Sequence, residues 1–377
     1  MTHGELRFGL LGSLQMSVNG ADLPLGAAKQ RAVLALLLIN RNRTVAIDSL
    51  IDAVWQQQPP PEARASLHAH VSRIRRLIGN AGGDPAAILA SAQPGYRLAV
   101  PEPDCDAGRF AIEYKAGIEA AEIGRFEQAS HHLSTALAEW RGPVLEDLRD
   151  FQFVDAFAAA LTEDKLEALT ARAESEIACG RTHSIIAQLE AVVTEHPYRE
   201  PLWAQLITAY YLAERQYDAL DAYGRLRTAL ADDLGIDPGP ALQRLHQRIL
   251  RQEPLDAKQA ARATAKRTAV TRRRPTEVVQ GEAVAYLRDG AGKRYPLRET
   301  ATRIGRLSDN DIVVDDDTVS RYHAVVIDTG NSFVITDLRS ANGVDVGRQR
   351  IRSSATLADG DCICICGHEF TFEMCPS

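Results

Sequence analysis

Three short polar motifs near the C-terminal end of the chain carry residue types that bind a phosphate group. The motifs are Gly305-Arg306, Ser320-Arg321-Tyr322-His323 and Ser340-Ala341-Asn342-Gly343. A dianionic phosphate is bound by a guanidinium fork together with hydroxyl or amide donors. The motifs supply such side chains at Arg306, Ser320, Arg321 and Ser340. The Asn342 amide can bond both the donor and the acceptor of an extended peptide backbone, which points to a phosphorylated peptide as ligand.

These motifs lie between short apolar segments that alternate with Gly, Asn and Asp. Many short strands with frequent turns predict an all-β sandwich, whose rigid frame presents its loops for binding. The predicted strands are Ala283–Leu287, Tyr295–Leu297, Thr302–Ile304, Ile312–Val314, Ala324–Asp328, Phe333–Asp337, Val344–Val346, Arg350–Ile351, Cys362–Cys366 and Glu369–Glu373.

In order and spacing, the three motifs closely resemble those of the forkhead-associated (FHA) domain, which binds phosphothreonine peptides. The resemblance implies that Arg306 and Ser320 bind the phosphate and that Asn342 holds the peptide backbone. It implies secondary contacts for Arg321 and Ser340. It also implies that phosphothreonine binds better than phosphoserine.

Other residues of the same motifs are assigned to structure and not to binding. His323 matches a buried position of the FHA domain that supports the binding loop. Gly305 and Gly343 are turn residues, since glycine adopts the backbone conformations that tight turns need.

The N-terminal region contains a helix with a polar and basic face. At 100° per residue, the predicted helix from Glu62 to Ile78 buries Leu67, Val71 and Ile74 on one side. Small residues on the opposite arc would let the helix approach the major groove, where Arg and Ser reach bases and phosphates. This arc holds Ala65, Ser66, Ala69, Ser72, Arg73 and Arg76, with His70 at its edge as a phosphate donor. An ordinary solvent-exposed helix face is the alternative.

The order of elements around this helix is that of a winged helix-turn-helix domain. We predict a short antiparallel sheet over residues 5–25, helices Ala28–Arg41 and Ile47–Gln57, and a hairpin Ile88–Val100. The region resembles the effector domain of response regulators. That resemblance implies DNA contacts from the wing and from the start of the first helix, by Tyr96, Arg97, Lys29 and Arg31.

From about Asp104 to Leu250 the apolar spacing is helical throughout. Two similar pieces, beginning at Gly180 and Glu214, lie about 34 residues apart, which is the tetratricopeptide period. A third at Gly124 is out of register, so a plain helical bundle remains an alternative. The run from Asp233 to Leu250 resembles the bacterial transcriptional activation domain of the Streptomyces antibiotic regulatory protein (SARP) family. The excess of acidic side chains over residues 101–254, 27 Asp and Glu against 15 Lys and Arg, favours a protein partner, for which we expect RNA polymerase; a spacer role is the alternative.

The predicted architecture is multidomain α+β, with one basic connecting segment. We assign residues 1–103 to the winged helix, 104–254 to the all-α tetratricopeptide-like domain, and 281–377 to the all-β FHA sandwich. Residues 255–280 are rich in Ala, Lys, Arg and Thr and bury too little apolar surface to order themselves. We predict a solvated basic linker there, with DNA phosphate contacts from Arg272-Arg273-Arg274 as the alternative.

Composition and motif content exclude several classes of function. No P-loop, Rossmann or hydrolase motif is present, so we expect no enzyme activity and no cofactor. Cys362, Cys364 and Cys366 alternate with isoleucines on one strand, which predicts a thiol-lined face; a metal site, the alternative, usually has wider spacing. The longest apolar run, Ala32–Ile39, cannot span a membrane. With so few cysteines, we expect a cytoplasmic protein without membrane insertion.

The full order of domains resembles SARP-family regulators that carry a C-terminal FHA domain. This resemblance implies a transcriptional regulator, most simply an activator, that binds double-stranded promoter DNA. It implies docking on the phosphothreonine of an autophosphorylated Ser/Thr protein kinase, phosphorylation by that kinase, and control of cell-wall arabinosyltransferase genes. The alternative is a phospho-dependent kinase adaptor or inhibitor with little promoter activity of its own.

Overall fold

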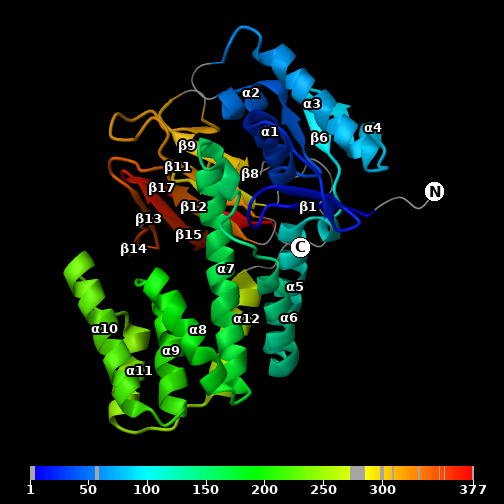
Figure 1. Ribbon diagram of the computed structural model, residues 1–377. Helices are drawn as coiled ribbons and strands as arrows, with labels where there is room; N and C mark the ends of the chain where they lie inside the picture. The colour runs from blue at the N-terminus through cyan, green and yellow to red at the C-terminus, as the bar shows by residue number, and fades with distance from the viewer. Residues whose placement is uncertain are drawn as a thin grey trace. The chain divides into compact units, whose positions relative to one another are not determined.

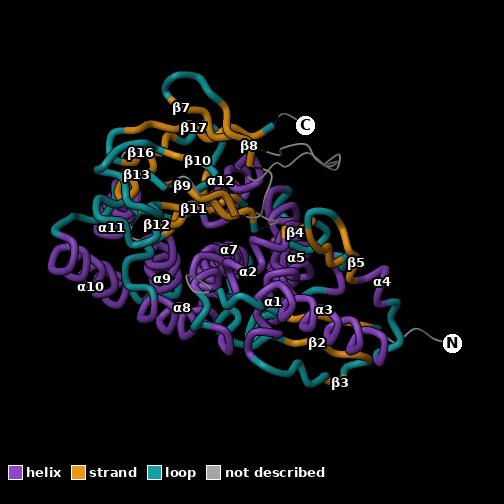
Figure 2. Tube along the Cα trace, turned by 90° about the horizontal axis from the view of Figure 1, so that it is seen from above, coloured by secondary structure: helices purple, strands orange, loops and turns teal. Residues whose placement is uncertain are grey.

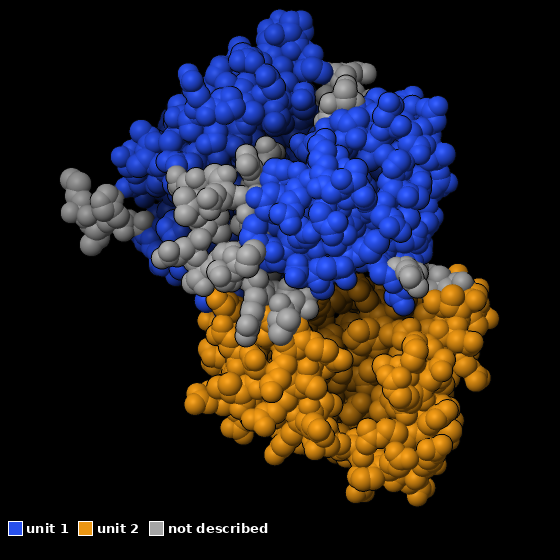
Figure 3. Space-filling model, turned by 180° about the vertical axis from the view of Figure 1, so that it is seen from behind, with its two compact units in different colours: residues 1–112, 138–164, 271–377 blue, residues 113–137, 165–270 orange. Residues whose placement is uncertain are grey.

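The computed structural model describes residues 5–55, 59–271, 285–297, 301–307, 310–329, 332–347, 349–351 and 353–375. The chain divides into two compact units, which Figure 3 colours separately. The first comprises residues 1–112, 138–164 and 271–377, and the second comprises residues 113–137 and 165–270. Within the described part of the chain, no helix has the length and apolarity needed to cross a membrane.

The N-terminal region of the first unit has the predicted winged-helix order. A three-stranded antiparallel sheet comes first, followed by three helices that pack on one another, as Figures 1 and 2 show. The strands are β1 (Leu6–Gly9), β2 (Gln15–Val18) and β3 (Ala21–Asp22), and the helices are α1 (Ala28–Ile39), α2 (Ile47–Trp55) and α3 (Ala63–Asn80). The predicted helix positions are confirmed, although α1 ends two residues before its expected end and α3 continues two residues beyond its own. The expected end of the second helix, Gln57, lies outside the described residues.

The wing is the predicted hairpin, extended by a strand that the sequence did not indicate. Strands β5 (Leu89–Ala92) and β6 (Gly95–Leu98) pair antiparallel, and β4 (Thr44–Ala46) pairs with the other edge of β6. The one-turn helix α4 (Pro85–Ile88) precedes the hairpin. Since α3 buries Leu67, Val71 and Ile74 as predicted, its opposite face is the one that remains polar.

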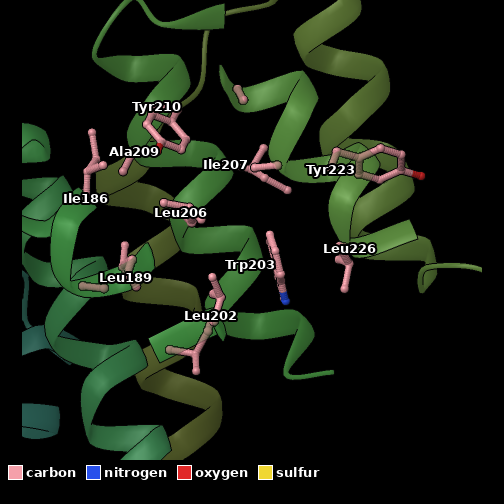
Figure 4. Close-up of a cluster of buried hydrophobic side chains, with 14 of the residues drawn as sticks. Ile186, Leu189, Leu202, Trp203, Leu206, Ile207, Ala209, Tyr210, Tyr223 and Leu226 are labelled. Atoms are coloured by element: carbon pink, nitrogen blue, oxygen red, sulfur yellow. The ribbon is translucent and has the colours of Figure 1, made fainter. Parts of the chain in front are cut away.

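The middle of the chain is helical, and α8, α9, α10 and α11 pack in turn against one another. The core of the second unit lies between α8, α9 and α10, where Trp203, Leu206 and Ile207 of α9 face residues of both neighbours (Figure 4). The bounds are α5 (Asp106–Glu122), α6 (Phe126–Ala138), α7 (Gln152–Ala178), α8 (Thr182–Glu195), α9 (Glu200–Leu212), α10 (Gln216–Leu234) and α11 (Pro240–Leu250), with short 3-10 helices at Glu102–Asp104 and Glu146–Leu148.

The prediction of an unordered linker is wrong for residues 257–271, which form helix α12 (Ala257–Thr271). Ala261 and Ala265 are both buried in a cluster made mainly of other alanines. Arg262 also donates a hydrogen bond to the carbonyl of Ile123, just past the end of α5, at 2.9 Å. Alanine is the strongest helix former, and a face of methyl groups packs closely without large side chains. The cluster Arg272-Arg273-Arg274 lies outside the described residues.

The C-terminal region is the predicted sandwich of two sheets, in which β11 and β12 match the predicted strands at both ends. One sheet has the order β10-β9-β11-β12-β15 and the other β14-β13-β16-β17-β7-β8. The strands are β7 (Ala285–Asp289), β8 (Arg294–Leu297), β9 (Ala301–Gly305), β10 (Ile312–Val313), β11 (Ala324–Asp328), β12 (Phe333–Asp337), β13 (Val344–Val346), β14 (Gln349–Arg350), β15 (Ser354–Leu357), β16 (Cys362–Ile365) and β17 (His368–Met374). Strand β15 was not predicted.

Candidate functional site

The first two phosphate-binding motifs lie on loops whose backbones are hydrogen-bonded to each other. Arg306 follows β9, and its backbone N–H donates to the carbonyl of Ser320 at 3.1 Å. The N–H of Leu307 donates to the carbonyl of Arg321 at 3.4 Å. Gly305 permits this approach, since a Cβ there would lie 2.3 Å from the Arg321 carbonyl oxygen. The structure therefore brings Arg306 next to Ser320, as the sequence predicted.

The third motif is joined to the second through side chains. The backbone N–H of Ala341 donates to the Ser320 hydroxyl oxygen at 3.0 Å. The Asn342 amide donates to the carbonyl of Thr318 at 2.9 Å. The Ser340 hydroxyl accepts the N–H of Gly343 at 2.8 Å, within its own loop. Ser340 and Asn342 thus lie on a loop that is bonded directly to the loop carrying Ser320.

His323 is fully buried and joins the same two loops from beneath. Its Nδ1 accepts the backbone N–H of Ser320 at 3.0 Å, and its Nε2 lies 2.9 Å from the carbonyl oxygen of Gly343. A backbone N–H only donates and a carbonyl only accepts, so the ring is neutral with its hydrogen on Nε2. The structural position expected for His323 is confirmed.

The loop before Ser320 is held by a carboxylate that the sequence did not single out. Asp316 accepts hydrogen bonds from the backbone N–H and the hydroxyl of Thr318, at 2.8 and 2.6 Å. It also lies 2.9 Å from Nε2 of His368. Hydrogen bonds from Thr318 and His368 lower the pKa of Asp316 to about 2. The carboxylate is therefore ionised at neutral pH and fixes the carbonyl to which Asn342 bonds.

The charged side chains at the ends of these loops are exposed. Arg306 forms an ion pair with Asp317, with its Nη1 3.5 Å from the carboxylate, and Asp317 is fully exposed. Arg321 is also exposed. The two arginines are thus accessible to an anion. In the free protein, Arg306 is paired with the Asp317 carboxylate of the adjacent loop.

A further positioning residue, Asn310, was missed in the sequence. Its amide donates to the carbonyls of Leu307 and Arg321, both at 2.9 Å, and the side chain is buried. It therefore holds the two loops that carry Arg306 and Arg321 together. Asparagine is common in turns, so its type and place in the sequence do not distinguish it from other loop residues.

The second candidate site is the polar face of α3. Ser72, Arg73 and Arg76 are exposed on it, as predicted, and Ser66 is half-buried. Whether these side chains contact DNA stays a prediction. Their arrangement offers two guanidinium groups and a hydroxyl one to four residues apart along the helix, which suits contacts to a duplex.

His70 and Lys29 lie together at the edge of this face. The Lys29 ammonium is 5.2 Å from the centre of the Trp55 ring, and the His70 ring is 6.1 Å from the same ring. Burial and then the positive charges of Arg73 and Lys29 lower the pKa of His70. The imidazole is consequently neutral at neutral pH.

The structure corrects one predicted DNA contact, that of Tyr96, and shows that a second residue, Arg31, is also bonded within the protein; the DNA contact of Arg31 stays a prediction. Tyr96 is buried, and its hydroxyl lies 2.6 Å from Nδ1 of His68, so it fixes the wing to α3. Arg31 pairs with Asp147 at 2.9 Å and donates to the Gly26 carbonyl at 2.8 Å. Both side chains are engaged within the protein. Arg97 is half-buried on β6, and its role stays a prediction.

Arg75 belongs to α3 but serves the wing. It donates to the Leu89 carbonyl at 2.9 Å and to the Ser91 hydroxyl at 3.0 Å, and its guanidinium lies 5.7 Å from the centre of the Tyr96 ring. Of the neighbouring arginines on this helix, Arg75 therefore positions the hairpin, whereas Arg76 faces solvent.

Three family models match successive parts of the chain. The model of the bacterial transcriptional activator domain matches residues 105–250, that of the FHA domain matches residues 302–366, and that of the C-terminal domain of transcriptional regulatory proteins matches residues 22–98. Transcriptional regulatory protein MoaR1 of Mycobacterium tuberculosis is 47% identical over 256 residues, which are 68% of this chain and 82% of that protein.

A second relative extends over the whole chain. Transcriptional regulatory protein EmbR of Mycobacterium tuberculosis is 62% identical over 371 residues, covering 98% of this chain and 96% of the relative. The solved structure of M. tuberculosis EmbR in complex with a low affinity phosphopeptide matches with a TM-score of 0.95 and 61% identity, covering 99% of both chains. The chain therefore belongs to the EmbR family of transcriptional regulatory proteins, with SARP-type domains followed by an FHA domain.

Proposed function

We propose that this protein regulates transcription by binding promoter DNA through α3, and that Ser/Thr phosphorylation controls it through the FHA domain. One observation carries the proposal: the loops that bear Arg306, Ser320 and Asn342 are hydrogen-bonded to one another. The bonds come from the backbone, from the Ser320 hydroxyl and from the His323 ring. Membership of the EmbR family supports it, and so does the phosphopeptide in the complex of the relative.

The phosphate ligands in this proposal are Arg306 and Ser320, with Arg321 and Ser340 as secondary contacts and Asn342 on the peptide backbone. Charge-assisted hydrogen bonds contribute about 1.5–3 kcal/mol each. Isothermal titration calorimetry with a phosphothreonine peptide should therefore show that Arg306→Ala loses most of its affinity. Arg303→Ala, which removes an exposed arginine of β9, the strand that ends just before Arg306, is the matched control. Unchanged affinity of Arg306→Ala would place the phosphate elsewhere.

The DNA-binding part of the proposal assigns base and phosphate contacts to Ser72, Arg73 and Arg76. Promoter binding in a mobility-shift assay should be lost in the double variant Arg73→Ala/Arg76→Ala. It should be retained in Arg149→Ala, which removes an exposed arginine outside the winged helix. The affinity of the unaltered protein should fall steeply as salt rises, because bound phosphates release counterions. Retained footprinting by the double variant would refute the assignment.

The partners follow from the same proposal. The phosphothreonine is carried by an autophosphorylated Ser/Thr protein kinase, and the acidic helical domain contacts RNA polymerase. The protein acts in the cytoplasm without catalytic activity, and arabinosyltransferase promoters are the first DNA to test. Chromatin immunoprecipitation would show enrichment at promoters, whereas an adaptor without promoter activity would show none.

A further inference from the structure

The Arg306 guanidinium, which our proposed function assigns to the phosphate, forms an ion pair with the carboxylate of Asp317. Asp317 lies in the same loop as Ser320, and the backbone of Arg306 is bonded to that of Ser320 at 3.1 Å. A phosphate bound by Arg306 therefore competes for the guanidinium with the Asp317 carboxylate, which lies 3.5 Å from its Nη1. In the free protein, the Asp317 carboxylate is therefore the anion paired with Arg306.

The loop holds Asp317 in this position through its neighbour. Asp316 is turned inward, where Thr318 and His368 bond to its carboxylate. Asp317 is turned outward, and its side chain is fully exposed except for the contact with Arg306. Because the Asp316 network fixes the turn, Asp317 is presented to Arg306 before any ligand arrives.

We propose that Asp317 is a specificity-determining residue of the phosphopeptide site, where it competes with the phosphate for Arg306. This inference rests on the proposed phosphothreonine binding. The competition lowers the fraction of protein in which Arg306 is open, and the observed affinity falls by that fraction. A ligand must therefore bring more charge and more acceptor oxygens than one carboxylate, and a phosphate dianion does so.

The magnitude follows from the exposure of the pair. Exposed ion pairs are weak because water screens them, so removing the competitor should tighten binding by only about two- to fivefold. The change should lie mainly in the association rate constant, because the pair must open before the phosphate can enter. Asp315 is the matched control, since it is an exposed aspartate two residues away on the same loop.

The experiment uses the full chain, a phosphothreonine peptide, and the variants Asp317→Asn and Asp315→Asn. Calorimetry gives the dissociation constants and stopped-flow fluorescence gives the rates, while thermal melting checks that both variants fold. We expect Asp317→Asn to bind about two- to fivefold more tightly, with a faster association, and Asp315→Asn to match the unaltered protein.

The outcomes separate this inference from the function on which it rests. If the unaltered protein binds the peptide and Asp317→Asn binds equally or more weakly, the competition is wrong and the proposed function stands. If Asp315→Asn tightens binding as much as Asp317→Asn, the cause is the net negative charge of the loop, and the proposed competition between Asp317 and the phosphate is again wrong. If no variant binds the phosphopeptide, the proposed function itself fails.

Discussion

The hydroxyl oxygen of Ser320 accepts a hydrogen bond from the backbone N–H of Ala341 at 3.0 Å. The hydroxyl hydrogen can then be donated to a phosphate oxygen, so one side chain both joins two loops and binds the ligand. We expect Ser320→Ala to weaken phosphothreonine-peptide binding by about 1.5–3 kcal/mol, measured by calorimetry. Ser353→Ala, an exposed serine outside the motifs, should bind normally. Equal loss in both variants would contradict the role.

Two adjacent arginines of α3 should give opposite results. Arg76 is exposed, so Arg76→Ala should weaken DNA binding and leave the melting temperature unchanged. Arg75 bonds to Leu89 and Ser91 of the wing, so Arg75→Ala should lower the stability of the winged helix by about 1 kcal/mol. Thermal melting and fluorescence anisotropy with labelled promoter DNA measure the two effects. A stability loss in Arg76→Ala alone would reverse the assignment.

DNA affinity should rise as the pH falls below neutral, because of His70. Burial and the charges of Arg73 and Lys29 lower its pKa in the free protein, so the ring is neutral at pH 7. A DNA phosphate nearby favours the protonated ring, and binding then takes up a proton. Anisotropy titrations at several pH values should show this dependence in the unaltered protein and a weaker one in His70→Gln. Identical pH profiles would exclude His70 as the cause.

Asp106 should be a large contributor to the stability of the first unit. Its buried carboxylate accepts the N–H groups of Leu10 and Leu11 and pairs with Arg141 at 3.0 Å. Asp106→Asn removes the charge and one acceptor, which leaves buried donors without a partner. The expected loss is about 3–5 kcal/mol in chemical denaturation. Asp52→Asn, an exposed site on α2, should change stability little; similar losses in both would contradict this.

Glu176 should make the second unit sensitive to acid. Hydrogen bonds from Arg181 and Ser130 lower its pKa from 4.5 to about 2. A carboxylate with a depressed pKa stabilises the fold above its unfolded pKa, and this contribution is lost as the pH falls from about 4.5 to about 2. Glu176→Gln should therefore cost about 2–3 kcal/mol at neutral pH. Urea denaturation at several pH values should also show that the free energy of unfolding of Glu176→Gln falls less steeply with acid than that of the unaltered protein.

The sandwich and its loops could be predicted because their signals are local. Strands β11 and β12 are short apolar runs that end in Asp residues, and both ends match the prediction. Strands β4 and β15 were missed because each contains only one large apolar side chain, so neither shows an alternating apolar pattern. The Arg306–Asp317 pair and the bonds of Asn310 depend on side-chain positions in space, which spacing along the chain does not report.

The exposed side chains of the winged helix could be predicted only where no other part of the chain bonds to them or covers them. The ion pair of Arg31 could not be foreseen because its partner, Asp147, comes from a distant part of the sequence. The DNA contact predicted for Tyr96 is wrong because the side chain is buried and its hydroxyl is bonded to His68 of α3. Helix α12 was missed because its buried face has no large apolar side chains to reveal it, whereas Ala261 and Ala265 pack through their small size.

The buried His323 has a consequence for the thermodynamics of recognition. Its ring connects Ser320 to Gly343 in the free protein, so these loops need not be ordered when a ligand arrives. The conformational entropy lost on association then falls on the peptide alone. An unstructured phosphorylated tail that already favours an extended conformation should consequently be a better ligand than a phosphothreonine held in a helix.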